Sequence, residues 1–339
     1  MAICFIIPPH ILQEIKERGS EEQKKWAEHS ITLSELLRTM RQSFTASPST
    51  VVSGHKNRII YTDNNTTDLP GIKVRSEGDP ASKDSAGDQA YDGTGATFDL
   101  YFNTYQRNSI DNKGMSLIST VHYSDKYDNA FWDGQQMVYG DGDGDLFGLF
   151  TKPIDVTGHE LTHGITQYTA NLQYQDQAGA LNESFSDVFG ILVKQQVLKQ
   201  TADTANWLIG EGIFTSKVHG VALRSMKAPG SAYDDPVLGR DPQPADMDHF
   251  VKTIDDNGGV HINSGIPNRA FYLAATAIGG YAWENAGKIW YLTLTSLLKS
   301  NANFVDCAHA TIEAAIQLFR KGSKEEMAVQ NAWKMVGVL

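Results

Sequence analysis

The chain of 339 residues has only two cysteines, Cys4 and Cys307, and no C-x-x-C pair. Two cysteines so far apart argue against a disulfide framework and against a cysteine-based zinc site. Basic residues are also scarce, with 29 lysines and arginines against 40 aspartates and glutamates and a formal charge of −11. An acidic chain is poorly suited to nucleic acid and to anionic membranes, so we expect neither as a partner.

Long apolar runs are missing as well. No stretch approaches the roughly 18 apolar residues of a membrane-spanning helix. The N-terminal stretch MAICFIIPP is apolar but short, lacks a basic region and ends in two prolines. We therefore expect no Sec signal peptide.

The remaining sequence divides into three regions with different residue patterns. Residues 11–44 alternate charged and apolar residues at helical spacing, with a break at Gly19-Ser20, and a Ser-, Thr- and Pro-rich linker follows. From about residue 56 to 150, short β-type runs such as NRIIYTD, GATFDLYFNTYQ and SLISTVHYS alternate with turn residues. From Pro153 onward the spacing is mostly helical. These patterns predict a small helical unit, a β-rich half and a helical half.

The stretch VTGHELTHGIT places His159 and His163 four residues apart, with Glu160 between them. Residues i and i+4 share one face of an α-helix, so the two imidazoles can bind one zinc ion. Asp155 is a candidate N-cap that would begin this helix one turn before the first histidine. The plain alternative is a helix that happens to contain two histidines.

A catalytic zinc site has three protein ligands and one open position, so a third ligand is needed. The candidate is Glu183 in GALNESFSDVFG, twenty residues after His163. Asp187 lies four residues further on the same expected helix and can accept the second ring N–H of a bound histidine. This N-E-x-x-x-D pattern favours zinc over the alternative, in which Glu183 is a solvated helix residue.

The segment DNGGVHINSG places two glycines before an isolated histidine. The glycines predict a tight backbone that presents His261 into a cleft, and Asp256 can orient or charge its ring. By itself this segment also fits a purely structural turn.

Together these segments resemble the thermolysin family of zinc metalloendopeptidases. The likeness rests on five motifs, NAFWDGQQMVYGDGDG, HELTH, NESFSD, LRSM and DNGGVHINSGI, and covers about residues 56–339. The short IIPPH segment is closest to the protealysin-type subgroup of precursors, which implies a bacterial protein that still carries its prosegment.

The resemblance implies an α+β fold of two lobes plus a small helical prosegment. The H-E-x-x-H helix would lie between a β-rich N-terminal lobe and a helical C-terminal lobe. We accordingly expect an inhibitory propeptide at residues 1–50, the β-rich lobe at 51–153, and the active-site helix with the helical lobe at 154–339.

The implied activity is that of a zinc-dependent neutral endopeptidase made as a zymogen. One zinc ion, held by His159, His163 and Glu183, would activate water, and Glu160 would act as the general base.

Further roles follow from the same resemblance. Tyr174 and His261, with Asp256 behind the histidine, would stabilise the oxyanion. The family's apolar pocket implies cleavage before bulky hydrophobic residues. The positions that match its substrate-binding residues are Asn129, Ala130 and Trp132 on an edge strand, Arg224 in LRSM, and Phe147, Phe150, Val156 and Leu223 in the pocket.

The chain departs from larger family members at their paired calcium site. The matching positions are Asp155, Lys194, Asn206 and Glu211. Because a lysine cannot be an oxygen ligand, we expect this calcium pair to be absent. The ammonium group of Lys194 would instead lie between Asp155 and Glu211.

An inhibitory prosegment is the natural interpretation of the first 50 residues. Its helices would dock on the helical lobe near the cleft, and the segment Phe5–His10 would reach the active site, with apolar Phe5, Ile6 and Ile7 suited to an apolar pocket. Pro8 and Pro9 lack a backbone N–H and have a fixed φ, so they cannot complete substrate-like strand pairing, and the segment would bind uncut.

Several alternatives remain open. Cys4 could instead cap the zinc as a thiolate, or the prosegment could be a tail without inhibitory role. Removal at Thr50–Val51 would be carried out by the molecule itself or by another protease.

The competing function is a zinc-containing but catalytically silent binding protein on the same fold. The presence of Glu160, Tyr174 and His261 weighs against it. We expect protein and peptide substrates, the chain's own propeptide as an intramolecular inhibitor, and a monomer. We also expect synthesis in a bacterial cytoplasm and secretion by a route that the sequence does not reveal.

Overall fold

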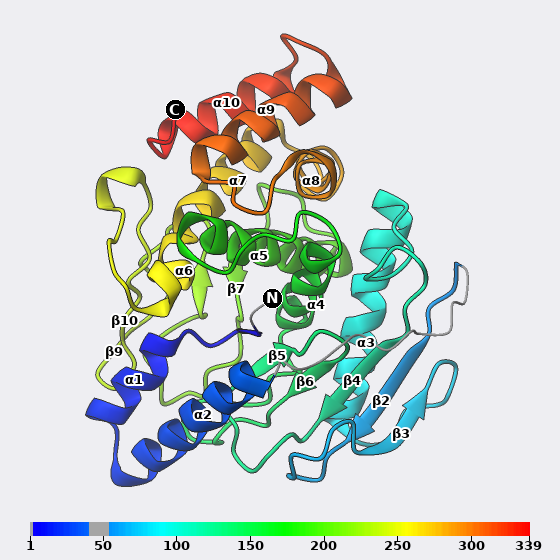
Figure 1. Cartoon of the computed structure of the whole chain (residues 1–339), viewed down its shortest axis with the longest axis vertical. Helices are drawn as coiled ribbons and strands as arrows, with labels where there is room; N and C mark the ends of the chain where they lie inside the picture. Colours follow the sequence, from blue (N-terminus) through cyan, green and yellow to red (C-terminus); the bar gives the residue numbers. More distant parts are fainter. Residues whose placement is uncertain (1–2, 41–53) are drawn as a thin grey trace.

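Strands from the first 140 residues form one mixed sheet (Figure 1). The computed structural model describes residues 3–40 and 54–339. The strands of this sheet are β1 (Cys4–Phe5), β2 (Arg58–Thr62), β3 (Ile72–Ser76), β4 (Leu117–Val121), β5 (Ala130–Trp132) and β6 (Met137–Tyr139). Their order is β1-β5-β6-β4-β2-β3, so the first residues of the chain form its edge. β2 and β4, and β4 and β6, run parallel, and the other neighbours are antiparallel.

Helices occupy both ends of the chain and its middle. They are α1 (Pro9–Arg18), α2 (Glu21–Met40), α3 (Ser85–Asp99) with the π-turn η2 (Leu100–Thr104), α4 (Ile154–Gln167), α5 (Asp176–Leu198), α6 (Asp256–Asn263), α7 (Gly265–Ile278), α8 (Asn285–Leu292) with η4 (Thr293–Leu297), α9 (Phe304–Phe319) and α10 (Lys324–Met335). The region between α5 and α6 contains the short pairs β7 (Leu208–Ile209) with β8 (Arg224–Ser225) and β9 (Asp234–Asp235) with β10 (Gly239–Arg240), and the 3-10 turn η3 (Met247–His249).

Figure 1 shows α4 and α5 in the centre of the molecule, between the sheet with α3 and the helices α7–α10. A single large apolar core runs through both halves, from the sheet to the last helix. Within the described ranges 3–40 and 54–339, no helix has the length and apolar character needed to cross a bilayer.

One segment predicted as a strand is helical. The run GATFDLYFNTYQ lies in α3 and η2, so the strand prediction for it is wrong. The buried residues of α3 and η2 recur at helical spacing, at Ala90, Thr94, Thr97 and Tyr101. Asp84 caps α3 by accepting from the backbone of the first turn. The aromatic residues in this run favoured a strand and hid the helical spacing of the buried residues in the sequence.

The two central helices cross at unusually small distance because glycines face each other there. A Cβ at Gly190 of α5 would lie 2.6 Å from the carbonyl oxygen of Asp155, and one at Gly158 of α4 would lie 3.0 Å from the Cα of Gly190. Side chains one turn from the crossing therefore meet across a narrow gap. This contact brings the HELTH and NESFSD motifs together.

The helix α4 begins after Pro153, which takes the N-cap position, so the prediction of Asp155 as N-cap is wrong. Asp155 lies in the first turn, and its buried carboxylate accepts from the backbone N–H of Gly210 at 3.0 Å.

The second helix, α2, docks on the β-rich half, whereas α1 contacts the second lobe, so the predicted docking on the helical lobe is wrong for α2. On α2, the side chains of His29, Ser30 and Ser34 bond to the loop that precedes β5, at Ser124, Asp128 and Tyr127. On α1, His10 contacts Tyr233, just before β9, at 3.0 Å. The proposed cleavage bond Thr50–Val51 lies outside the described residues.

Candidate metal centre and active site

The two histidines of the HELTH motif face the same point from successive turns of α4. His159 and His163 are fully buried, and their Nε2 atoms are 3.0 Å apart. The carboxylate of Glu183, on α5, lies 3.4 Å from each of these nitrogens. The i, i+4 spacing and the α4–α5 crossing therefore produce the predicted convergence of three side chains.

The second ring nitrogen of each histidine is held by a hydrogen-bond acceptor. His159 Nδ1 donates to Asp187 Oδ1 at 2.8 Å, and His163 Nδ1 to Asn182 Oδ1 at 2.9 Å. The amide of Asn182 is fixed because its nitrogen donates to the carbonyl of Leu172. With Nδ1 protonated, the Nε2 lone pairs of the neutral rings point at each other and at a carboxylate.

Such a convergence of acceptors fits a bound cation. Glu183 Oε2 is buried and has no hydrogen-bond partner within the described ranges. Burial disfavours the charged form of Glu183, but the surrounding histidines outweigh it and lower the pKa of this carboxyl. Two imidazole nitrogens and one carboxylate are a donor set typical of catalytic zinc. These residues fit the metal.

The charges around the two rings differ. Burial lowers the pKa of His163 to about 3, which keeps the ring neutral as a ligand must be. Burial also opposes protonation of His159, but the neighbouring carboxylates of Asp187 and Glu183 outweigh it and raise its pKa to about 9. A metal would take the place of the proton that these carboxylates attract.

Glu160 lies between the histidines and the edge of the sheet. Its Oε2 accepts from the backbone N–H of Trp132 on β5 at 3.1 Å, and its buried Oε1 has no partner in the described part of the chain. Burial raises the pKa of Glu160 to about 8. A carboxyl with this pKa can accept and return a proton near neutral pH.

Tyr174 and His261 face the third ligand from the opposite side. The hydroxyl of Tyr174 donates to Glu183 Oε1 and lies 3.2 Å from His261 Nε2. His261 Nδ1 is 2.7 Å from Asp256 Oδ1, whose other oxygen accepts the backbone N–H of His261. Burial opposes protonation of His261, but Asp256 and Glu183 outweigh it and raise the pKa of the ring.

The tight backbone predicted before His261 is present. Residues 256–259 all have positive φ, from 51° to 83°. Gly258 and Gly259 supply two of these left-handed residues without a steric penalty. The strained turn folds Asp256 back onto the ring it orients.

The first residues of the chain lie between the metal centre and β5. Cys4 pairs with Trp132 and Phe5 with Phe131 in antiparallel register. The pairing continues past the strand, because Ile6 N donates to Ala130 O at 3.2 Å and Ile7 N to the side chain of Asn129 at 3.0 Å. The paired run thus ends at Ile7, directly before the two prolines. Pro8 and Pro9 follow the paired residues, and Pro9 begins α1.

Two side chains hold the carbonyl groups of this segment. His261 Nε2 is 3.1 Å from the carbonyl oxygen of Phe5, and Arg224 donates to that of Ile6 at 3.2 Å. Arg224 is buried and makes two further bonds to Asp187, at 2.8 and 2.9 Å. Asp187 thus contacts both a histidine of the metal centre and the arginine that holds the prosegment.

The side chain of Ile6 is fully buried. It belongs to the large apolar core, which also contains the four pocket positions predicted from sequence, Phe147, Phe150, Val156 and Leu223. His10, the last residue of the predicted inhibitory segment, is half-buried beside Tyr233, and burial lowers its pKa to about 4.

A separate charged cluster lies at the start of α4. Lys194 Nζ is 2.9 Å from Glu211 and 3.9 Å from the buried Asp155, and it also donates to Asn206 and to the carbonyl of Leu208. Its ammonium group therefore lies among the oxygen atoms at the positions that match the paired calcium site.

Two residues that orient the site were missed in the sequence. Asn182 holds His163, and Asn268 on α7 donates to Asp187 Oδ2 at 2.8 Å. Asn182 could have been identified, because it directly precedes Glu183 within the motif. Asn268 has no local signal, since it is 81 residues away in the sequence and reaches the site only through the fold.

Two family models match the chain. One describes the catalytic domain of thermolysin metallopeptidases and matches residues 36–167. The other describes the α-helical domain of thermolysin metallopeptidases and matches residues 170–338. These matches confirm the predicted α+β fold and its division into a first lobe and a helical second lobe.

Full-length relatives are also similar. The chain is 49% identical to an extracellular metalloprotease of Pectobacterium carotovorum subsp. carotovorum, over 99% of this chain and 96% of the relative. It is 49% identical to the protease PrtS of Photorhabdus sp. (strain Az29), over 98% of this chain and 91% of that protein. A solved structure, the precursor of protealysin from Serratia proteamaculans, is 53% identical and superposes with a TM-score of 0.91, covering 99% of this chain and 100% of that one.

Proposed function

The chain belongs to the thermolysin family of metallopeptidases, and we propose that the centre between α4 and α5 is its peptide-cutting site, closed in this form by its own first residues. Zinc is the family's catalytic metal, and the chain is a metalloendopeptidase precursor. The convergence of His159, His163 and Glu183 beside Glu160 carries the assignment. Zinc held there supplies a Lewis acid that polarises a water molecule or a carbonyl group.

In this proposal Glu160 is the general base. Its Oε1 is buried and has no partner within the described ranges, so it is available to a water molecule on the metal side. Glu160 takes the proton as the water attacks the substrate carbonyl carbon and gives it to the departing amine nitrogen. No second base is needed, because the Glu160 carboxyl group carries out both proton transfers.

The charge that develops on the substrate carbonyl oxygen needs hydrogen-bond donors. We assign this role to the hydroxyl of Tyr174 and to Nε2–H of protonated His261. The bound prosegment supports the assignment, since the Phe5 carbonyl oxygen already lies 3.1 Å from His261 Nε2. Asp256 keeps the ring charged and oriented through Nδ1.

The prosegment also indicates how a substrate lies. A peptide that repeats its bonds adds an antiparallel strand to β5 and uses Ala130 and Asn129 as partners. Arg224 then holds the carbonyl of the residue after the cut, and the pocket around Ile6 receives that residue's side chain. The apolar lining supports a preference for bulky hydrophobic residues at this position.

By the same reasoning, one bond of the prosegment lies at the proposed position of cleavage. The peptide group between Phe5 and Ile6 has its carbonyl at His261 and its N–H at the carbonyl of Ala130. The first residues therefore exclude substrate by occupying the site in the direction of a substrate. This arrangement supports residues 1–50 as an intramolecular inhibitor, with catalytic lobes at 51–153 and 154–339.

Three further proposals concern the whole protein. The lysine cluster described above supports the absence of the paired calcium site, because the Lys194 ammonium group supplies the positive charge that calcium would bring. Relatives named as extracellular metalloproteases support secretion. We further propose that the protein acts as a monomer, without nucleic acid or membrane as a partner.

The test is an intact-mass time course on the purified full chain with zinc, beside Glu160→Gln and the exposed α9 control Glu313→Gln. We expect the wild type and the control to lose the prosegment, whereas Glu160→Gln binds one zinc and stays intact. Cleavage of Glu160→Gln at the wild-type rate would contradict Glu160 as the base of self-processing.

An uncut wild-type chain requires a second step. Trace trypsin and a casein-type substrate are then added. Casein hydrolysis after trypsin treatment identifies a zymogen that another protease activates. No hydrolysis after loss of the prosegment would instead identify a zinc-containing binding protein, and the proposed function would be wrong.

A further inference from the structure

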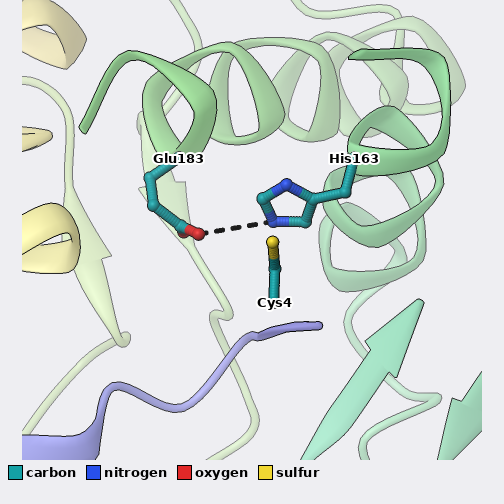
Figure 2. A group of neighbouring side chains, drawn as sticks. All are labelled: Cys4, His163 and Glu183. Carbon is teal, nitrogen blue, oxygen red and sulfur yellow. Dashed lines mark ion pairs between the residues drawn. The ribbon is translucent and has the colours of Figure 1, made fainter. Parts of the chain in front are cut away.

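The thiol of Cys4 lies beside two of the three proposed zinc ligands (Figure 2). One ligand atom each from Cys4, His163 and Glu183 lie within 4.8 Å of one another, and all three residues are buried. Figure 2 shows the sulfur pointing from the N-terminal segment toward the His163 ring, with the carboxylate of Glu183 at its side. A thiol, an imidazole and a carboxylate in this arrangement are a possible metal-binding set.

The strand geometry explains why the sulfur faces this way. Side chains alternate between the two faces of a strand, so Cys4 and Ile6 share one face and Ile3 and Phe5 the other. Ile3 and Phe5 pack in a cluster with aromatic residues of the sheet, on the side away from the pocket. Ile6 is buried in the main apolar core instead, and β1 packs against α4. The pairing of Cys4 with Trp132 therefore fixes the thiol on the metal side.

An independent feature also points to a ligand in this space. Glu183 is only 1% exposed. Its Oε2 atom lies in the same gap and has no hydrogen-bond partner in the described part of the chain. The Nε2 lone pairs of His159 and His163 converge on it as well. These atoms define the centre toward which the sulfur is directed.

We propose that the Cys4 thiolate is the fourth ligand of the zinc ion in the unprocessed chain, which rests on the proposed function of His159, His163 and Glu183. The thiol releases its proton to solvent on binding. A catalytic zinc site keeps its fourth position open for water, whereas a structural site fills it with a protein ligand. Cys4 converts the first kind of site into the second.

This assignment predicts that the Phe5–Ile6 bond stays uncut in the precursor. That bond lies at the cleavage position and is held by the groups that would hold a substrate. With the fourth position taken by sulfur, no water is placed to attack it. Removal of the prosegment withdraws the sulfur and opens the position, so latency and activation depend on one coordination bond. The alternative is that Cys4 is only a small side chain that fits the gap.

Cobalt(II) in place of zinc distinguishes the two, because a thiolate ligand gives an intense near-ultraviolet charge-transfer band that nitrogen and oxygen ligands do not. The full chain carries Glu160→Gln in every sample so that it stays intact. The test variant adds Cys4→Ser, and the matched control adds Cys307→Ser, which alters a cysteine of α9 that is equally buried. Visible cobalt bands report occupancy of the site in all samples.

We expect the near-ultraviolet band in the parent chain and in the Cys307→Ser control, and its loss in Cys4→Ser with the visible bands retained. A second measurement uses no cysteine substitution. Trypsin removes the prosegment of the parent chain, gel filtration separates it, and the band should disappear. Competition with a chelator should also remove cobalt faster from Cys4→Ser than from the control.

Two results would overturn the proposal. Visible bands without the near-ultraviolet band in the parent chain, or a band that persists in Cys4→Ser, would show that Cys4 does not bind the metal while the three-ligand site stands. Absence of any cobalt spectrum in the parent chain would reject the metal site itself, and the role of Cys4 with it.

Discussion

Truncation of Ile6 should open the precursor by a predictable amount. Ile6 is fully buried, and the proposed function puts its side chain in the pocket for the residue after the cut. Burial of an isoleucine side chain is worth about 1.5–3 kcal/mol, and a cavity left by truncation adds to the loss. Ile6→Ala should therefore weaken docking by about 2–3 kcal/mol, which raises the undocked fraction roughly 30- to 150-fold at 1.4 kcal/mol per factor of ten.

The assay is the initial rate of hydrolysis of a small fluorogenic peptide by uncut precursor, with intact mass measured in the same samples. Ile6→Val should give a smaller rise of about 2- to 12-fold, since this change costs about 0.5–1.5 kcal/mol. Leu36→Ala on α2 is the matched control, because that side chain is 54% exposed in the same prosegment. An Ile6→Ala precursor as silent as the Leu36→Ala control would refute the argument that pocket filling by Ile6 keeps the site closed.

Three other predictions concern the mature fold and the chemistry. Lys194→Ala leaves the buried Asp155 without its cation and should lower the free energy of unfolding by about 1–3 kcal/mol in denaturant titrations, while EGTA leaves the wild-type Tm unchanged. A hydrogen bond to Asp141 outweighs the effect of burial and raises the pKa of His122 to about 9, above its value in the unfolded chain. The stability that protonated His122 gives the fold is therefore complete below about pH 6.5 and is lost as the pH rises through 9. Relative to His122→Gln, the wild type should lose about 1–2 kcal/mol of stability across that window, a value reduced for solvent screening of the partly exposed pair. Tyr174→Phe should lower kcat about 10²- to 10³-fold through loss of one oxyanion donor, with zinc content unchanged.

Each of these has a control and a contrary outcome. Lys321→Ala, an exposed lysine, should leave the unfolding free energy within about 0.5 kcal/mol, and an EGTA-dependent drop in wild-type Tm would show that calcium is bound after all. His309→Gln, on the exposed face of α9, should keep the wild-type pH dependence. If His122→Gln keeps it too, the ion pair does not stabilise the fold. A Tyr174→Phe enzyme with unchanged kcat would remove the tyrosine from the proposed mechanism.

The parts of the site that could be predicted from sequence are those fixed by local spacing. His159 and His163 share a helix face because the helix has 3.6 residues per turn, and Glu183 with Asp187 repeat that spacing on the next helix. The glycines before His261 likewise imply their own backbone conformation. In these places the residues that act together lie within a few positions of one another, so their arrangement could be predicted without knowing the fold.

The remaining features depend on contacts that are distant in sequence. The run Phe5–Ile7 is apolar throughout, so its pattern does not decide which peptide group faces the metal. The register is set by the partners Ala130 and Asn129 and by the start of α1 at Pro9. The docking of α2 on the β-rich half depends in the same way on polar groups of one loop, such as Tyr127. Neither the strand register nor the docking of α2 could be predicted from the periodicity of the prosegment.

One carboxylate joins the metal centre to substrate recognition. Asp187 Oδ1 accepts from His159 and from Arg224, both at 2.8 Å, and its other oxygen accepts from Arg224 and from Asn268. Arg224 in turn holds the carbonyl of Ile6, which in the proposed function stands for the residue after the cut. A buried charge that is fully bonded in this way holds its partners in one geometry, because any displacement leaves a buried donor or acceptor unpaired. In the proposed function, the Asp187 carboxylate therefore fixes both the orientation of the zinc ligand His159 and, through Arg224, the placement of the peptide.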